Sequence, residues 1–128
     1  VLSGIPKSMP GLLRSFQIGK RAASTGFDWP TTTDVIEKIN EEVSEIRHAL
    51  ARNETKNVEE EIGDLILAIA NLSRKLGVEP EIALQRANNK FERRFDLLTE
   101  RIQERGRSLA ETPQEELNKE WDKIKECE

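Results

Sequence analysis

The sequence predicts an all-α protein with a bundle-type core of antiparallel helices, and three observations support that fold class. Charged residues make up 34% of the 128 residues, aromatic residues only 5%, and tyrosine is absent, a balance that suits helical proteins better than sheet proteins. Apolar residues recur every three or four positions along most of the chain. Glycine or proline stands at the ends of these periodic segments, where helices start and stop. At this length we expect one domain with a substantial core.

The chain opens with an irregular segment and a first helix. Residues 1–9 contain glycine and proline and are predicted to be a linker, so that a single domain covers residues 10–128. A helix is expected at about 10–23, since proline is well tolerated in a first helical turn. Residues 26–30 then form a loop, because the residue before a proline avoids the α region. The chain begins with valine rather than methionine, so we expect a fragment of a longer protein.

Two amphipathic helices are predicted next, at about 34–52 and 57–76, joined by a short polar turn. Asp34, with Glu37 three residues on, resembles a capping pair, and Thr33 is an equally good N-cap. Both helices carry an apolar stripe with the helical period. The stripes comprise Val35, Ile36, Ile39, Val43, Ile46 and Leu50 on the first helix, and Val58, Ile62, Leu65, Ile69, Leu72 and Leu76 on the second.

Two further helices complete the predicted fold. One is expected at about 80–105, and the spacing of its stripe favours long antiparallel packing in a bundle. The last helix has a strong start signal, with Thr112 as N-cap, Pro113 at the first position and Glu115 at the third. The two stripes comprise Leu84, Ala87, Phe91, Phe95, Leu98 and Ile102, and then Leu117, Trp121 and Ile124.

The main functional signal is a set of four carboxylates on the second and third predicted helices. Glu42 and Glu45 are three residues apart and therefore share one face of the second helix. Glu61 and Asp64 repeat this spacing on the third. Antiparallel packing would bring all four together, and their mutual repulsion then requires protons or a cation. Oxygen-only ligand sets suit hard cations such as Mg²⁺ or Mn²⁺, so we expect a metal site carried by this helix pair.

Solvation is the competing interpretation of these acidic residues, since acidic pairs are common on helix surfaces. It is the better interpretation for Glu41 and Glu60, because helical phase sets them apart from the other carboxylates. It is weaker for Glu61, which falls inside an apolar stripe, where an unpaired buried charge costs on the order of several kcal/mol.

Basic and aromatic side chains also have ordinary interpretations. Lys90 and Arg94 share one flank of the fourth predicted helix and would pair with acidic side chains on a solvated face. From periodicity alone, Trp121 is favoured as a core anchor of the last helix and Trp29 as a plug at one end of the bundle. The only histidine, His48, lies among polar residues, and a solvated surface position is expected for it.

Bulk properties exclude several classes of protein. The net charge of −4 gives no general attraction to nucleic acid. The single cysteine, Cys127, offers neither a disulfide framework nor a cysteine-based zinc site, which fits a reducing compartment. No apolar run approaches membrane-spanning length, and no signal peptide is recognisable. We therefore expect a cytoplasmic protein without membrane or nucleic-acid partners.

The available chemistry is limited to carboxylates, metal ions and basic residues. The sequence has no glycine-rich phosphate loop and no serine in a nucleophile-elbow context. Carboxylate-bound metal ions can neutralise phosphate oxygens and activate water, while lysine and arginine stabilise phosphate charge. The sequence therefore points to metal-assisted phosphoryl chemistry.

Six segments form an ordered set of motifs. They are GFDWP (26–30), EEVSE (41–45), EEIGD (60–64), GDLILAIANLSRKLG (63–77), ALQRANNKFERRF (83–95) and EELNKEWDKIK (115–125). One ExxE or ExxD motif is weakly specific. The full set in order is highly specific, and it resembles the C-terminal catalytic domain of the MazG nucleoside triphosphate pyrophosphohydrolases, whose signature is EExxE…ExxD. Residues 2–9 resemble the segment that joins this domain to an N-terminal half, which would make the chain the C-terminal part of a longer protein.

The resemblance implies a fold and an activity. The implied fold is all-α with a four-helix core, assembled as a homodimer. The implied activity is Mg²⁺-dependent hydrolysis of nucleoside triphosphates to the monophosphate and pyrophosphate, with deoxynucleotides and non-standard nucleotides among the expected substrates.

The resemblance also implies roles for individual residues. The positions that match the family's metal ligands are Glu42, Glu45, Glu61 and Asp64. Lys90 and Arg94 match residues that contact the triphosphate, and Lys38 falls in the nucleotide-contacting stretch. Trp121 matches an aromatic residue next to the nucleotide. The segment before Glu61 departs from the family pattern, because it offers Lys56 where a basic residue is expected slightly later.

Two other functions compete with this one. A non-enzymatic helical dimerisation or regulatory module with a vestigial acidic cluster is the first, although a decayed site would be expected to have lost one of the four carboxylates. A helical nucleic-acid-binding domain is the second, using the KFERR segment (90–94) together with Arg101, Arg105 and Arg107. The acidic net charge and the interspersed glutamates argue against it.

Overall fold

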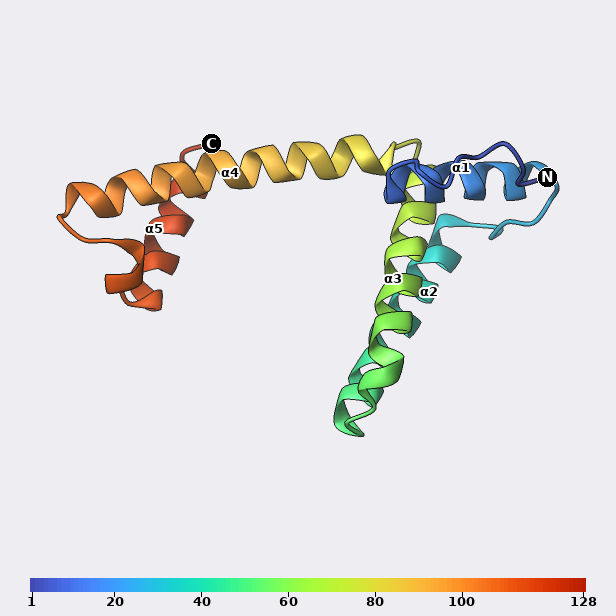
Figure 1. Cartoon of the computed structure of the whole chain (residues 1–128), viewed down its shortest axis with the longest axis horizontal. Coiled ribbons are helices and arrows are strands. Elements are labelled where there is room, and N and C mark those ends of the chain that lie inside the picture. Colours follow the sequence, from blue (N-terminus) through green and yellow to red (C-terminus); the bar gives the residue numbers. More distant parts are fainter. The chain divides into compact units, whose positions relative to one another are not determined.

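The computed structural model describes the backbone of residues 1–128 and every side chain except that of Thr55. Across that backbone the chain is helical and contains no strand (Figure 1), which confirms the predicted all-α class. The elements are α1 (Gly11–Ser24), α2 (Thr32–Ala51), α3 (Thr55–Lys75), α4 (Pro80–Glu104), the short 3₁₀ helix η1 (Leu109–Glu111) and α5 (Gln114–Glu126). Among these helices none is long and apolar enough to cross a membrane.

The chain divides into two compact units, residues 1–83 and residues 84–128. The first unit holds α1, α2, α3 and the first turn of α4, and the second holds the remainder of α4 with η1 and α5. The predicted lead-in, residues 1–9, contains turns and no helix, and Arg21 of α1 donates hydrogen bonds to the carbonyl oxygens of Val1 and Ser3.

The start of α2 differs from the prediction, which placed the capping pair at Asp34 and Glu37. The observed N-cap is Thr31, whose hydroxyl accepts a hydrogen bond from the Asp34 backbone N–H at 3.1 Å. The Asp34 carboxylate accepts one from the Thr31 backbone N–H at 3.2 Å, which closes a capping box. The capping pair is therefore Thr31 and Asp34, three residues apart as predicted but one turn earlier. Asp34 is the second residue of this pair rather than the first.

Helices α2 and α3 form an antiparallel hairpin joined by residues 52–54 (Figure 1). Asn53 adopts a left-handed conformation with φ 56°, and the Glu54 backbone N–H donates to the Ala49 carbonyl oxygen, which ends α2. The side chains between the two helices follow heptad-like rows in which every member is buried or half-buried. The rows comprise Val35, Ile39, Glu42, Ile46 and Ala49 on α2, and Val58, Glu61, Leu65, Ala68 and Leu72 on α3. We call these ten residues the hairpin seam.

Several residues of the predicted apolar stripes lie outside this seam. The exposed members are Ile36 (44%), Val43 (37%), Leu50 (60%), Ile62 (44%), Ile69 (44%) and Leu76 (60%). Each predicted stripe therefore contains more apolar residues than this unit buries. Some of these residues lie on the hairpin seam, and the others lie beside it and are exposed. Exposed apolar patches of this kind are typical of interaction surfaces.

Helix α1 packs on α3 through a close approach at Gly19. A Cβ atom at Gly19 would lie 2.5 Å from Oδ1 of Asn71 and 3.0 Å from Nε of Arg74. The absence of a side chain at Gly19 therefore allows the two helices to meet, and Asn71 is buried beneath α1 with 6% of its surface exposed.

The second unit has its own small core. Leu98, Ile102 and Ile124 are buried together, with Leu97, Leu109, Leu117 and Trp121 packed around them. Helix α5 begins at Gln114 with Pro113 as its N-cap residue, one position later than predicted. The Thr112 hydroxyl, expected to cap α5, instead donates a hydrogen bond to the Ser108 carbonyl oxygen at 2.8 Å.

Candidate metal centre

Three of the four predicted metal ligands lie together in the hairpin. Glu42 and Glu45 come from successive turns of α2, and Glu61 comes from the facing turn of α3. Each offers a carboxylate oxygen, and these oxygens lie within 4.8 Å of one another. We call these three residues the carboxylate cluster. The predicted spacing and antiparallel packing therefore bring the three side chains together.

Asp64, the fourth predicted ligand, does not belong to this group of three. It is exposed on α3, and it lines a cavity of about 260 Å³ together with Glu42. Glu41 and Glu60, which helical phase set apart from the cluster, are both exposed.

Two oxygens of the cluster have no hydrogen-bond partner among the described residues. They are Oε2 of Glu42 and Oε2 of Glu61, and both atoms are buried. Glu42 is the more deeply placed residue, with only 3% of its surface exposed, although the sequence pointed to Glu61 as the core-facing carboxylate. A buried carboxylate oxygen without a partner is costly, and a hard cation is well satisfied by a set of ligands that are all oxygens. The residues present therefore fit a divalent metal ion.

The three carboxylates shift one another's proton affinity. Hydrogen bonding to Glu45 and then to Glu42, together with burial, raises the pKa of Glu61 to about 7. Burial also raises the pKa of Glu42, but hydrogen bonds from Lys38 and from Glu61 outweigh it and leave that pKa below its ordinary value. The neighbouring carboxylates therefore make Glu61 easier to protonate than an ordinary glutamate.

Lys38 is the basic residue that pairs with the cluster. Its Nζ atom lies 3.0 Å from Oε1 of Glu42 and 3.6 Å from Oε1 of Glu41. The hydrogen bond to Glu42 raises the pKa of Lys38, so the ammonium stays charged. The family resemblance implied that Lys38 contacts the nucleotide, and in this structure the side chain offsets part of the carboxylate charge.

The cavity that Asp64 shares with Glu42 also contains a residue that sequence reasoning missed. Trp29 lines it, together with Lys38, Leu67, Ala68 and Asn71. Periodicity alone favoured Trp29 as a plug at one end of the bundle, because periodicity does not show which cavity a loop residue lines. Its position two residues before the N-cap of the helix that carries Glu42 was the available signal.

Polar residues line a second cavity, of about 200 Å³, that reaches Glu45 and Glu61. Its lining comprises Glu45, His48, Ala49, Arg52, Glu54, Asn57 and Glu61. Lys56, the basic residue that the sequence offered for this loop, is not part of the lining, whereas Arg52 and His48 are. His48 is exposed, as predicted, but it faces this cavity.

The remaining predicted substrate-binding residues belong to the second unit. Lys90 is exposed on α4. Arg94 donates a hydrogen bond through Nε to Oε2 of Glu128 at 2.8 Å, and its Nη2 atom lies 2.7 Å from the same oxygen in an ion pair. These contacts lower the pKa of Glu128, so the ion pair is charged at neutral pH.

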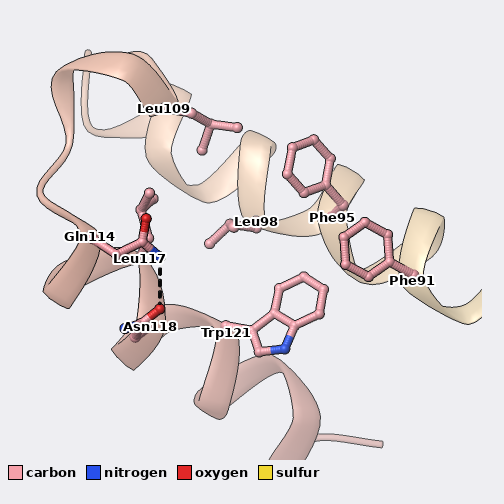
Figure 2. Close-up of a pocket in the computed structure, with 8 residues that line it drawn as sticks. All are labelled: Phe91, Phe95, Leu98, Leu109, Gln114, Leu117, Asn118 and Trp121. Atoms are coloured by element: carbon pink, nitrogen blue, oxygen red, sulfur yellow. Dashed lines mark hydrogen bonds between the residues drawn. The ribbon is translucent and has the colours of Figure 1, made fainter. Parts of the chain in front are cut away.

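Trp121 lies against aromatic and aliphatic side chains of the second unit. Figure 2 shows its indole beside Phe91, with ring centroids 5.3 Å apart, at the edge of a pocket of about 320 Å³. Gln114 and Asn118 line the same pocket and are joined by a 2.9 Å hydrogen bond. Trp121 therefore anchors α5 on α4, the ordinary role that periodicity suggested, and its contact with a nucleotide stays a prediction.

This chain is similar both to a known protein domain and to the sequences of individual proteins. Residues 31–99 match the MazG nucleotide pyrophosphohydrolase domain. The chain is 40% identical over 129 residues to the nucleoside triphosphate pyrophosphohydrolase of Escherichia coli K12, an alignment that covers 99% of this chain and 49% of that protein. It is 42% identical over 117 residues to the nucleoside triphosphate pyrophosphohydrolase/pyrophosphatase MazG of Thermotoga maritima, covering 91% of this chain and 45% of that protein. The chain thus spans about half the length of these relatives.

Proposed function

The chain belongs to the MazG nucleotide pyrophosphohydrolase family, and on this premise we propose that it hydrolyses nucleoside triphosphates to the monophosphate and pyrophosphate. Deoxynucleoside triphosphates and non-standard nucleotides are included among the proposed substrates. The observation that carries the proposal is the pair of buried carboxylate oxygens, one from Glu42 and one from Glu61, that have no partner among the described residues. Carboxylates arranged in this way can hold the cation that phosphoryl chemistry requires.

We assign four residues to the metal site and expect Mg²⁺ there, with Mn²⁺ as an alternative. The proposed ligands are Glu42, Glu45, Glu61 and Asp64. Glu42, Glu45 and Glu61 offer oxygens to one point, and Asp64 borders the adjoining cavity with Glu42. When bound, the metal ion supplies neutralisation of the phosphate oxygens and a lower pKa for the attacking water.

The proposed reaction is attack of water on the α-phosphorus, with pyrophosphate as the leaving group. Lys90 and Arg94 are proposed to bind phosphate oxygens and to stabilise the charge that develops on pyrophosphate. Arg94 would exchange its ion pair with Glu128 for this contact. Lys38, already held against Glu42, would offset negative charge on the nucleotide side of the cluster. Trp121 is proposed to lie next to the nucleotide.

We also propose that the working form is a homodimer with a four-helix core. The support is the uncovered apolar surface beside the hairpin seam, where Ile62 and Ile69 of α3 are each 44% exposed. A second copy of the chain could cover such a surface, and burial of exposed apolar area stabilises an assembly.

Measurement of pyrophosphate release tests the activity. Wild-type protein with Mg²⁺ and a panel of nucleoside triphosphates should release pyrophosphate, and removal of the metal with EDTA should abolish the reaction. Glu61→Gln should lower kcat by roughly a hundred-fold or more, as loss of a charge-stabilising group at an active centre does. Glu60→Gln is the matched control, because Glu60 precedes Glu61 and is exposed outside the cluster.

Equal rates for wild type and Glu61→Gln would remove Glu61 from the mechanism. If the protein hydrolysed none of the triphosphates with either Mg²⁺ or Mn²⁺, the proposed activity would be wrong. The non-enzymatic dimerisation module would then be the better interpretation.

A further inference from the structure

The loop between α1 and α2 is fixed from several sides. Gly26 ends α1 in a left-handed conformation with φ 94°, and the Phe27 backbone N–H donates to the Ala22 carbonyl oxygen at 3.3 Å. On the other side of Trp29, the chain enters α2 through the capping box that starts at Thr31. Hydrogen bonds from backbone N–H groups therefore hold the chain on both sides of Trp29.

Asp28 ties the same loop to the end of α3. Its carboxylate accepts hydrogen bonds from Arg74 at 2.6 and 3.2 Å and from Lys75 at 3.1 Å. It also accepts one from the Trp29 backbone N–H at 2.9 Å. The bond from Arg74 is the main reason that the pKa of Asp28 falls to about 2, so this clamp is charged at neutral pH. The Trp29 backbone is thus positioned by three charged side chains as well as by its neighbours.

Trp29 lines a cavity whose walls combine aromatic, aliphatic and charged residues. Leu67 and Ala68 of α3 contribute aliphatic side chains. Glu42, Asp64 and Lys38 contribute the charged groups. Small-molecule sites typically combine an apolar and aromatic lining with a few charged groups in this way. A nucleotide has matching chemistry, with a flat aromatic base at one end and phosphates at the other.

Asn71, the one side-chain amide that lines the cavity, already forms hydrogen bonds within the protein. Nδ2 of Asn71 donates to the Leu67 carbonyl oxygen at 3.2 Å, and its Oδ1 accepts from Nε and Nη2 of Arg74 at 3.4 Å. The Asn71 carboxamide is therefore held in place by α3 and offers few free groups to the edge of a base. Stacking, which every base can provide, is the interaction that remains.

We propose that Trp29 is the stacking platform for the nucleobase of the substrate, which lies on the indole while the phosphates reach towards Glu42 and Asp64. This assignment rests on the proposed function and adds a residue that recognises substrate without selecting among bases. Asp28 acts as a positioning residue, because its ion pairs hold the loop that presents the indole.

Kinetics on Trp29→Ala and Trp29→Phe test the proposal. The alanine variant should raise KM for ATP, GTP, CTP and UTP by about ten-fold to a hundred-fold, the loss expected for one base–aromatic stack, with kcat changed far less. The phenylalanine variant should recover most of the affinity. Thr33→Ala is the control, since Thr33 is exposed near the start of α2 and lines neither of the two cavities that Trp29 lines.

Inorganic tripolyphosphate separates a base contact from a structural effect, because it carries phosphates but no base. Its inhibition constant should be the same for wild type and Trp29→Ala. An equal weakening of tripolyphosphate and nucleotide would overturn the assignment, as would an unchanged KM in Trp29→Ala.

A binding measurement keeps this inference distinct from the proposed activity. In the presence of Ca²⁺, ATP should quench the tryptophan fluorescence of wild type more than that of Trp29→Phe, and tripolyphosphate should quench neither strongly. If wild type failed to hydrolyse nucleotides yet showed this difference, the activity would be wrong and the base platform would stand. Equal quenching of the two proteins by ATP would overturn the platform.

Discussion

Glu42 and Glu61 occupy seam positions that a helix hairpin ordinarily fills with apolar side chains. Their neighbours in the two rows are Ile39, Ile46 and Leu65, which are half-buried as such positions require. The carboxylates interrupt this packing and leave two buried oxygens without partners among the described residues. Replacing them with aliphatic residues would favour the hairpin, so their presence is better explained by ligand binding than by folding.

At Asp28 the clamp should contribute to stability only while the carboxylate is ionised. Its pKa is lowered from 3.8 to about 2, so the contribution is fully present above the ordinary pKa and is lost as the pH falls towards 2. We expect Asp28→Asn to lower the free energy of unfolding by about 1 kcal/mol at neutral pH, because solvent screens the ion pairs of an exposed carboxylate. Urea denaturation at several pH values should show this difference shrinking between pH 4 and pH 2.

The control for the Asp28 measurement is Asp96→Asn, because Asp96 is an exposed carboxylate on α4. Its replacement should change stability little at any pH. A difference between wild type and Asp28→Asn that stayed constant from neutral pH to pH 2 would show that the carboxylate charge is not what holds the loop.

Between elements, the close approach of α1 and α3 depends on a single glycine. A Cβ atom at Gly19 would lie 2.5 Å from Oδ1 of Asn71, so Gly19→Ala requires a buried side chain to move. We expect this variant to lower the free energy of unfolding by about 1–3 kcal/mol, as overpacked positions do. Chemical denaturation monitored by circular dichroism measures the change.

Gly63→Ala in α3 should have the opposite effect on stability from Gly19→Ala. A Cβ at Gly63 meets no described atom within 4 Å, so alanine should stabilise the helix by about 0.5–1 kcal/mol. If Gly19→Ala were as stabilising as Gly63→Ala, α1 would not be packed tightly on α3.

Sequence periodicity predicted the helices well because each carries a long apolar stripe. The predicted bounds of α1 to α4 agree with the structure to within two residues. Helix starts were less predictable, since Thr31, Thr33 and Asp34 are all good caps and only the hydrogen bonds distinguish them. The spacing of Glu42, Glu45 and Glu61 predicted their cluster, because neighbouring helices leave such side chains little choice of direction.

Two features of the candidate site could not be predicted from periodicity. Trp29 is in a loop, and its place in the cavity depends on the ion pairs of Asp28 with Arg74 and Lys75, which are more than forty residues away in the sequence. The burial of Glu42 depends on which side of the broad apolar surface of α2 packs against α3. The wide apolar stripe in the sequence does not show which side that is.

For the whole molecule, the uncovered apolar side chains of α2 and α3 predict assembly. Light scattering after size exclusion should give twice the 14.6 kDa mass of one chain. Ile69→Glu, at a 44% exposed position of α3, should shift the protein towards monomer by placing a charge on the surface proposed to be covered. Leu2→Glu is the matched control, since Leu2 is 48% exposed in the lead-in, and a monomeric wild type would contradict the proposal.

Within one chain, few large side chains are fully buried. Those identified among the described residues are Val35, Ile102 and Ile124, and only Val35 belongs to the first unit. In a single chain, the backbone amides of α2 and α3 would therefore exchange their hydrogens with solvent quickly, because little more than local helix stability protects them. Dissociation of the proposed dimer would expose these amides. Their deuterium uptake should therefore slow as the protein concentration rises and the dimer forms. Dilution would then lower the stability of the hairpin by separating the two copies.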